Sequence, residues 1–204
     1  MRPTARHLVH LAMLSVAAVV ACRRPVTGTR TAATPAATPA TASSASPASA
    51  DARVSQANVV AIVLAANNTD ISYARLVPAR TSNPEVRAFA QRMLTDHTLL
   101  NARIMDIAAR DLIIVEDNQT SLDFRDHSAG RRDIMRELTG AKFDSTYIAN
   151  EILYHRELLD AISSVLIPNT RSAELRDFVT NLRPAVSAHL AHAEQIRATL
   201  ASRR

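Results

Sequence analysis

The chain has 204 residues, of which 24 are Lys or Arg and 19 are Asp or Glu, giving a formal net charge of +5 at pH 7. Two of these positive charges, Arg2 and Arg6, lie in a segment that we expect to be removed, and the remainder is too small to favour nucleic acid as a partner. The single cysteine, Cys22, excludes an internal disulfide, so packing must stabilise the fold.

Residues 1–21 have the features of an export signal peptide. Their charged start is followed by an apolar run from Leu8 to Ala21 with small residues at its end. A membrane-spanning helix needs roughly 20 apolar residues, and this run is shorter. We therefore expect cleavage of the segment in preference to a retained transmembrane anchor.

The end of the signal, Val19-Val20-Ala21-Cys22, resembles a bacterial lipobox. In such a sequence, cleavage before the cysteine leaves its thiol and its new amine to carry acyl chains. An ordinary signal peptide is the alternative, because the same residues suit the general signal peptidase. An aspartate directly after the cysteine would retain a lipoprotein at the inner membrane, but Arg23 and Arg24 stand there. We therefore expect a protein that is anchored to the outer membrane by lipid on Cys22 and faces the periplasm.

Residues 22–53 are expected to form the lipidated cysteine and a disordered tether. From Pro25 to Arg53 the chain is mostly Ala, Thr, Ser and Pro, which cannot bury enough surface to offset the entropy of ordering. A flexible segment of this length has an end-to-end distance of roughly 30 Å. Residues 54–204 then form one domain, and because apolar residues recur there every three or four positions, we predict an all-α fold.

The first two long helices are placed by their apolar stripes. Helix one covers about residues 55–81, and Pro78 is expected to bend its last turn. Helix two is expected to begin after Asn83 as N-cap, with Pro84 at the first helical position.

The second half of the domain begins with a long crossover at residues 112–140. The crossover starts apolar and is expected to contain a short helix around residues 131–138, ended by Gly140. Helix three covers about 141–166, and helix four, with a kink at Pro184, covers about 172–201. These elements predict an antiparallel four-helix bundle with a long crossover between helices two and three.

Polar side chains interrupt the apolar stripes near the middle of all four helices. Because the midpoints of antiparallel helices lie at one level, these groups are expected to converge on one buried site. His192, one turn after His189, lies at the edge of the same stripe. The candidate metal ligands are Asp70, His97, Glu151, His155, His189 and His192.

The chemistry of this set favours a single transition-metal ion. Di-iron bundles use Glu-x-x-His pairs, which this domain does not have on its four long helices, whereas a set rich in imidazole suits zinc, copper or a single iron, with manganese also possible. Asp96 is rotated by about 100° from His97, so we expect it to be a solvated neighbour or to hold a ligand from behind.

A hydrogen-bonded polar layer is the alternative interpretation of the same residues. Asp70 and Glu151 could pair with the histidines across the bundle and fix the helix register without any ligand. The functional hypotheses are accordingly metal binding, for metal handling or envelope stress, and a non-catalytic envelope interaction module. Redox enzyme activity would also need an open coordination position and a path for a substrate, and no motif in the chain requires catalysis.

Four stretches of the sequence carry a family resemblance. They are Asn83–Met93, Asp96-His97-Thr98, Phe143-Asp144 with Tyr147, and His189–Ala193. Together they resemble a bacterial family of exported domains of unknown function, often labelled as outer membrane proteins, for which a ferritin-like bundle is expected. The resemblance covers about residues 55–198, and its most specific part is residues 93–98.

The resemblance implies roles for individual positions. Asp70 stands where the family usually has a glutamate, the Asp96-His97 pair is kept, and His189 matches the histidine of helix four. A second Asp-His pair is usual on helix three, but here Tyr154 precedes His155. This departure argues against a two-fold symmetric site.

Overall fold

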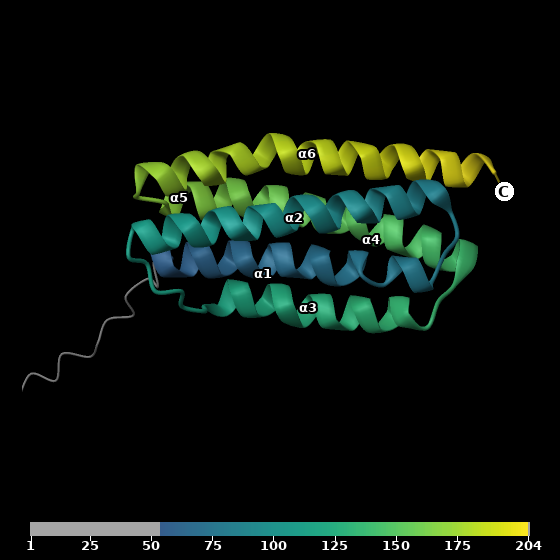
Figure 1. Ribbon diagram of the computed structural model, residues 1–204, viewed down its shortest axis with the longest axis horizontal. Coiled ribbons are helices and arrows are strands. Elements are labelled where there is room, and N and C mark those ends of the chain that lie inside the picture. The colour runs from purple at the N-terminus through teal and green to yellow at the C-terminus, as the bar shows by residue number, and fades with distance from the viewer. Residues whose placement is uncertain (1–53, 204) are drawn as a thin grey trace, which may run out of the picture. The chain divides into compact units, whose positions relative to one another are not determined.

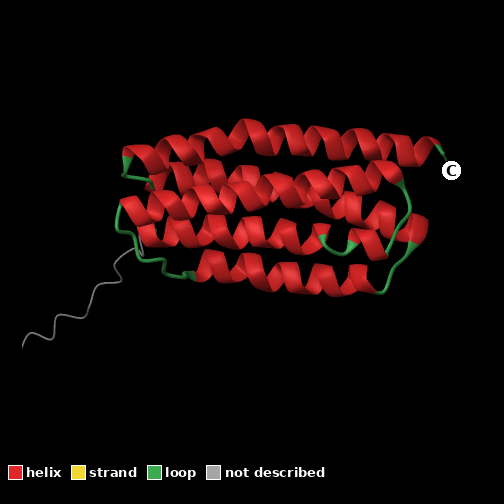
Figure 2. Ribbon diagram, in the orientation of Figure 1, coloured by secondary structure: helices red, strands yellow, loops and turns green. Residues whose placement is uncertain are grey.

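The computed structural model describes residues 54–203 as an all-α structure, and this part of the chain contains no strand (Figures 1 and 2). The predicted signal peptide, Cys22 and the tether lie outside the described residues. No helix within residues 54–203 is both long and apolar enough to cross a membrane. The elements are α1 (Gln56–Ala74), the 3-10 turn η1 (Val77–Ala79), α2 (Pro84–Arg110), α3 (Gln119–Arg136), α4 (Gly140–Ala161), the π-helical turn η2 (Ile162–Leu166), α5 (Ile167–Asn169) and α6 (Ala173–Ser202).

One end of this helical unit is formed by residues 54–58, 111–118 and 169–174, and we call it the Val54 end. The Gln56 side chain donates a hydrogen bond to the carbonyl of Asn169 (2.7 Å). The Asn58 side chain donates to the carbonyl of Glu116 (2.9 Å). The start of α1 therefore lies beside the α2–α3 loop and the α5–α6 turn.

The opposite end brings together the remaining helix termini. The amide of Gly140 donates to the carbonyl of Arg80 (2.8 Å), and Arg203 forms an ion pair with Glu85 (2.9 Å). Consecutive long helices therefore run in opposite directions (Figure 1). Because α3 returns the chain to this opposite end, α2 and α4 run parallel to each other.

Helix α1 is the most enclosed element, because it packs against both α2 and α3. The run Val59–Ile62 is fully buried on every side of the helix, which a sequence of small and β-branched residues allows. On the other side of the unit, α4 packs against α6, and α6 also contacts α2. Tyr154 of α4 reaches α1, where its hydroxyl donates to the carbonyl of Ala66 (2.7 Å).

The predicted start of α2 is confirmed. Asn83 is its N-cap, and the side-chain oxygen accepts hydrogen bonds from the amides of Glu85 (3.0 Å) and Val86 (3.4 Å). Pro84 occupies the first helical position, where its missing amide hydrogen costs nothing. Pro184 lies within the unbroken helix α6.

The prediction for the crossover was wrong in two respects, the length of its helix and the role of Gly140. The helix, α3, is 18 residues long. The residues that α3 buries are Ser121, Ser128 and Met135, spaced by seven, so two of the three positions of its contact stripe are not apolar. Its N-cap, Asn118, accepts a hydrogen bond from the amide of Ser121 (3.0 Å). Gly140 does not end this helix but begins α4, with a φ of 57° that glycine adopts without strain.

Two further boundaries differ from the prediction. The first helix ends at Ala74, and Pro78 lies in the separate turn η1. The third predicted helix is continuous to Ala161 and then widens into η2 before the short α5, which contains Pro168. The loss of one regular hydrogen bond at a proline accounts for both interruptions.

Candidate metal centre

Five buried side chains from four helices meet in the interior. Asp70 comes from α1, His97 from α2, Glu151 and His155 from α4, and His189 from α6. The first four are 0% exposed and His189 is 5% exposed. Potential ligand atoms of the three histidines lie within 4.8 Å of one another, and so do those of Asp70, Glu151 and His155. Five of the six residues expected from the sequence are thus together, and we call them the buried cluster.

The carboxylate of Asp70 lies between two imidazoles. Its Oδ2 is 3.1 Å from Nε2 of His97 and 3.9 Å from Nε2 of His155. The carboxyl of Glu151 lies one helical turn before His155, and its Oε2 is 3.5 Å from Nδ1 of that ring. Residues four apart on a helix share a face, which explains why α4 contributes two members of the cluster.

The imidazole of His97 is oriented by a chain of amide side chains. Its Nδ1 is 2.9 Å from Oδ1 of Asn67, whose own nitrogen donates to Asn101 (3.0 Å). Asn101 in turn donates to Asn68 (2.9 Å). With the Asn67 oxygen toward the ring, Nδ1 of His97 donates the hydrogen bond and Nε2 faces Asp70 with its lone pair; with the amide reversed, Nε2 carries the proton and donates to Asp70.

The other two imidazoles are oriented in the same way. Nδ1 of His155 donates to the backbone carbonyl of Glu151 (2.8 Å). Nε2 of His189 donates to the carboxylate of Asp96 (3.0 Å), whose side chain is 40% exposed. Both partners are acceptors, so the lone pairs of His155 Nε2 and His189 Nδ1 remain free.

These lone pairs have no hydrogen-bond partner within the described part of the chain. By strict hydrogen-bond geometry the same holds for the carboxyl oxygens of Asp70 and Glu151. Asp70 is nevertheless at ion-pair distance from His97, and hydrogen bonding of Glu151 with Asp70 and Tyr147 contributes to its pKa, so the cluster atoms without any near partner among the described residues are His155 Nε2 and His189 Nδ1. Buried polar atoms in folded proteins are almost always paired. Histidines that ligate metals typically donate their other ring hydrogen to a carbonyl or carboxylate, which is the pattern of all three histidines here.

The pKa values of the two carboxyl groups in the cluster are shifted in opposite directions. Burial raises the pKa of Asp70, but the adjacent histidines, His97 first, outweigh it and lower the pKa below its usual value. Burial and then the charge of Asp70 raise the pKa of Glu151 well above its usual range. The lowered pKa favours the ionised form of Asp70, and the raised pKa favours the neutral form of Glu151.

Two of the histidines are neutral at pH 7. Burial lowers the pKa of His97, although the charge of Asp70 opposes the change. Burial likewise lowers the pKa of His189 to about 4, although the hydrogen bond that His189 donates to Asp96 opposes the change. Neutral imidazoles are the form that binds metal ions, so the folded protein already holds these two rings ready.

The comparison with protein families matches residues 38–196. They match the model of a domain of unknown function, DUF4142, over more than three quarters of the chain. The chain belongs to the DUF4142 family. No curated protein and no solved structure matches the chain.

All members of the buried cluster lie within the DUF4142 match, and so does His192. The structure does not bring His192 to the cluster: it is half-buried, and its ring lies 5.3 Å from that of Phe89. One helical turn after His189, a residue on the edge of the α6 stripe faces the side of the bundle and not its centre.

Asn67 and Asn101 are residues of the DUF4142 domain that the sequence reasoning missed. The spacing of Asn67 and Asp70, three residues apart on one predicted helix, places them on one face and was the available signal. For Asp96 the sequence left two roles open, a solvated neighbour or a group that holds a ligand from behind. Its carboxylate accepts a hydrogen bond from His189, which is the second of these arrangements.

Proposed function

We propose that this DUF4142 protein binds one transition-metal ion at the buried cluster, for metal handling or stress protection in the cell envelope. His97, His155, His189 and Asp70 would be its ligands. The observation that carries the proposal is the orientation of the three imidazoles, each fixed from outside with an unpartnered lone pair toward the others. Histidines that ligate metals are typically held from behind in this way.

The distance between Asp70 and His97 is compatible with a cation at this point. Oδ2 of Asp70 and Nε2 of His97 lie 3.1 Å apart. A metal ion bound by both atoms would satisfy this pair, and so would a ring proton on Nε2. Burial lowers the pKa of His97 and disfavours the charged ring, so a metal ion competes with the neutral Nε2–H tautomer alone.

The donor set selects the class of metal. Three imidazoles and one carboxylate suit zinc, copper, iron or manganese, whereas calcium and magnesium prefer oxygen ligands alone. The single negative charge of Asp70 would partly neutralise a divalent ion. Glu151, neutral beforehand, offers a further oxygen ligand that must lose its proton to bind.

The arrangement of helices fits this function. Helices α1, α2, α4 and α6 supply the ligands, and α3 makes the long connection between α2 and α4. We infer a ferritin-like bundle, a fold that builds metal sites from inward side chains at the middle of its helices. The Glu-x-x-His pairs of di-iron proteins are absent from the four helices that supply the cluster, so the proposal is for one ion.

A purely structural polar layer is the less supported function. A network that only fixes helix register lowers its energy by pairing its own members, and a partly satisfied network is destabilising. Here Asp70 and His97 can pair with each other, but the lone pairs of His155 Nε2 and His189 Nδ1 lack hydrogen-bond partners within residues 54–203. The polar layer is therefore the outcome to be distinguished by experiment.

The test is the metal content of protein purified without chelator or affinity tag, by mass spectrometry. We expect about one ion per chain in the wild type and in a control variant, His127→Ala with His192→Ala. We expect no ion in the variant His97→Ala, His155→Ala, His189→Ala, with helical content followed by circular dichroism. If that variant does not fold, titration of the metal-free wild type with iron, zinc, copper and manganese replaces it. A wild type that contains no metal and binds none of the four would overturn the proposal.

We also propose that the protein is exported and anchored through lipid on Cys22 to the outer membrane, facing the periplasm. The lipobox resemblance at residues 19–22 and the arginines that follow it support this. Mass spectrometry of the mature N-terminus should find acyl chains on Cys22, and Cys22→Ala should release the protein from the membrane fraction. A mature chain with an unmodified Cys22 would contradict anchoring and favour simple secretion.

A further inference from the structure

The α2–α3 loop exposes two large apolar side chains. Leu112 is 88% exposed and Ile114 is 87% exposed, more than any other large apolar residue of the described chain. Leu112 also has a φ of 52°, in the left-handed region that a leucine rarely adopts. This conformation ends α2: Leu112 follows the C-cap Asp111, and the amides of Leu112 and Ile113 donate to the carbonyls of Ala109 (3.3 Å) and Ala108 (2.8 Å). The cap therefore fixes the backbone that carries the exposed leucine.

This loop belongs to the Val54 end, where the described chain begins. Asn58 in the first turn of α1 donates to the carbonyl of Glu116 in the loop (2.9 Å), and Ser172 donates to Asp111. Val54, the first described residue, therefore lies at the same end as Leu112 and Ile114. If Cys22 is held in a membrane, the Val54 end is the end nearest the lipid.

We propose that Leu112 and Ile114 insert into the surface of a phospholipid bilayer and hold the Val54 end against the membrane. The proposal rests on the proposed anchoring through Cys22. Apolar side chains of peripheral proteins enter the boundary between headgroups and acyl chains, about 5–10 Å deep. The loop would thus act as a second, weak membrane contact that orients the domain.

Two other occupants of the loop are disfavoured. The segment between Cys22 and Val54 contains only one large apolar residue, Val26, so it lacks the side chains to cover the loop. A second copy of the chain would need a larger surface, because stable interfaces bury about 800 Å² per partner and the loop offers two side chains.

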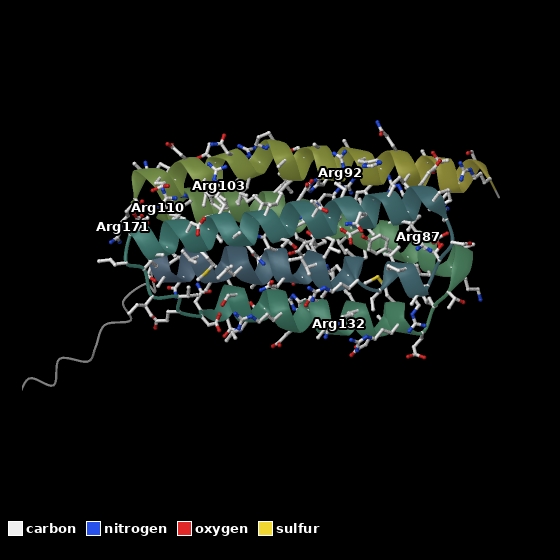
Figure 3. The ribbon with its side chains drawn as sticks, in the orientation of Figure 1. Arg87, Arg92, Arg103, Arg110, Arg132 and Arg171 are labelled. Atoms are coloured by element: carbon white, nitrogen blue, oxygen red, sulfur yellow. The ribbon has the colours of Figure 1, made fainter. Side chains whose placement is uncertain are left out.

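The charges around the loop indicate which force drives the contact. Arg110 and Arg171 lie at this end (Figure 3), but Arg110 is paired with Glu174 (2.7 Å), and Glu116 and Asp117 lie in the loop itself. The surface around the α2–α3 loop therefore carries both positive and negative charges. Insertion should depend on the apolar side chains and only weakly on anionic lipid or salt.

The expected strength of insertion suits a tethered protein. Each fully buried leucine or isoleucine raises a partition constant by roughly one to two powers of ten. Insertion of two such residues would bind an untethered domain to the bilayer only weakly. A flexible tether holds the domain near the surface at an effective concentration on the order of millimolar, so even weak insertion becomes the dominant state.

The chain contains no tryptophan, so one introduced tryptophan reports its own surroundings. The mature chain, beginning at Cys22, is coupled through its only thiol to a maleimide lipid in phosphatidylcholine vesicles. Ile114→Trp is compared with the control Leu153→Trp, an exposed position (48%) in the middle of α4. Brominated lipids then measure how deep each indole lies.

We expect quenching at position 114 to be at least about threefold that at position 153, with a blue-shifted emission, because the first indole lies within the bilayer. The added substitution Leu112→Asp should abolish the difference. Equal quenching at both positions would overturn the proposal, as would a blue shift at position 114 that depends on protein concentration without lipid, which would indicate a second copy. Because the coupling is chemical, these outcomes do not depend on whether cells lipidate Cys22.

Discussion

Asp96 offers the sharpest test of how the buried cluster binds metal, because it acts from outside the cluster. Its carboxylate accepts the Nε2 hydrogen of His189 at 3.0 Å and so keeps the Nδ1 lone pair directed inward. In Asp96→Asn the amide group can instead donate to Nε2, which moves the ring proton to Nδ1. The hydrogen bond is preserved, but the ligand atom is blocked.

The expected effect on metal affinity is large and the effect on folding is small. Loss of a group that orients a ligating histidine typically costs 10- to 100-fold in metal affinity, which is about 1.4–2.8 kcal/mol. The Asp96 side chain is 40% exposed, so the free energy of unfolding of the metal-free protein should change by less than about 1 kcal/mol. If Asp96 had only a structural role, the substitution would lower the free energy of unfolding and leave the metal affinity unchanged.

The assay is competitive titration of zinc into metal-free protein, with urea unfolding measured on the same samples. Asp106→Asn is the matched control, since Asp106 is an exposed aspartate on the same helix α2. We expect its affinity to equal that of the wild type. An unchanged affinity in Asp96→Asn would refute the assignment of His189 Nδ1 as a ligand atom.

Three further predictions concern the metal-free protein. Between about pH 4 and 6.5 the unfolded chain protonates His189, whereas the folded protein keeps it neutral because its pKa is about 4. The unfolded state thus binds about one proton more at this site, so His189 alone should lower the stability by about 1.4 kcal/mol per pH unit as the pH falls through this window; the lowered pKa of His97 acts in the same direction and the raised pKa of Glu151 opposes it, and urea midpoints that do not move would contradict the assignment. Glu151→Gln should change stability at pH 7 by less than about 1 kcal/mol, since a neutral group replaces a neutral group, and a loss of 3 kcal/mol or more would mean that Glu151 is ionised. Tyr154→Phe removes the donor to the carbonyl of Ala66 and should cost about 1–2 kcal/mol in thermal or urea unfolding while zinc affinity stays constant; a weaker affinity would show that this hydroxyl also positions the cluster.

The sequence predicted the elements that bury large apolar residues. The start of α2 could be located at Asn83 and Pro84 because the cap and the proline act locally. Asp70, His97 and His189 could be placed together because each interrupts an apolar stripe at the middle of its helix, so burial and level followed from helical periodicity.

What the sequence did not predict depends on contacts between small or uncharged groups. Helix α3 packs through Ser121 and Ser128, which no apolar periodicity reveals, although the capping residue Asn118 marks its start. The orientation of His97 depends on Asn67, and an asparagine on a buried face has many possible partners. Such pairings are determined by the three-dimensional packing and not by spacing along the chain.

The attachment of α3 has a consequence for how the interior exchanges with solvent. This helix covers α1 through few large side chains, with Ser121, Ser128 and Met135 as its buried residues and Phe124 half-buried. Segments with little buried apolar surface open at a lower free energy than the whole domain. Helix α3 would therefore detach as a unit while α1, α2, α4 and α6 remain folded, so that α1, enclosed in the resting state, becomes transiently a surface helix.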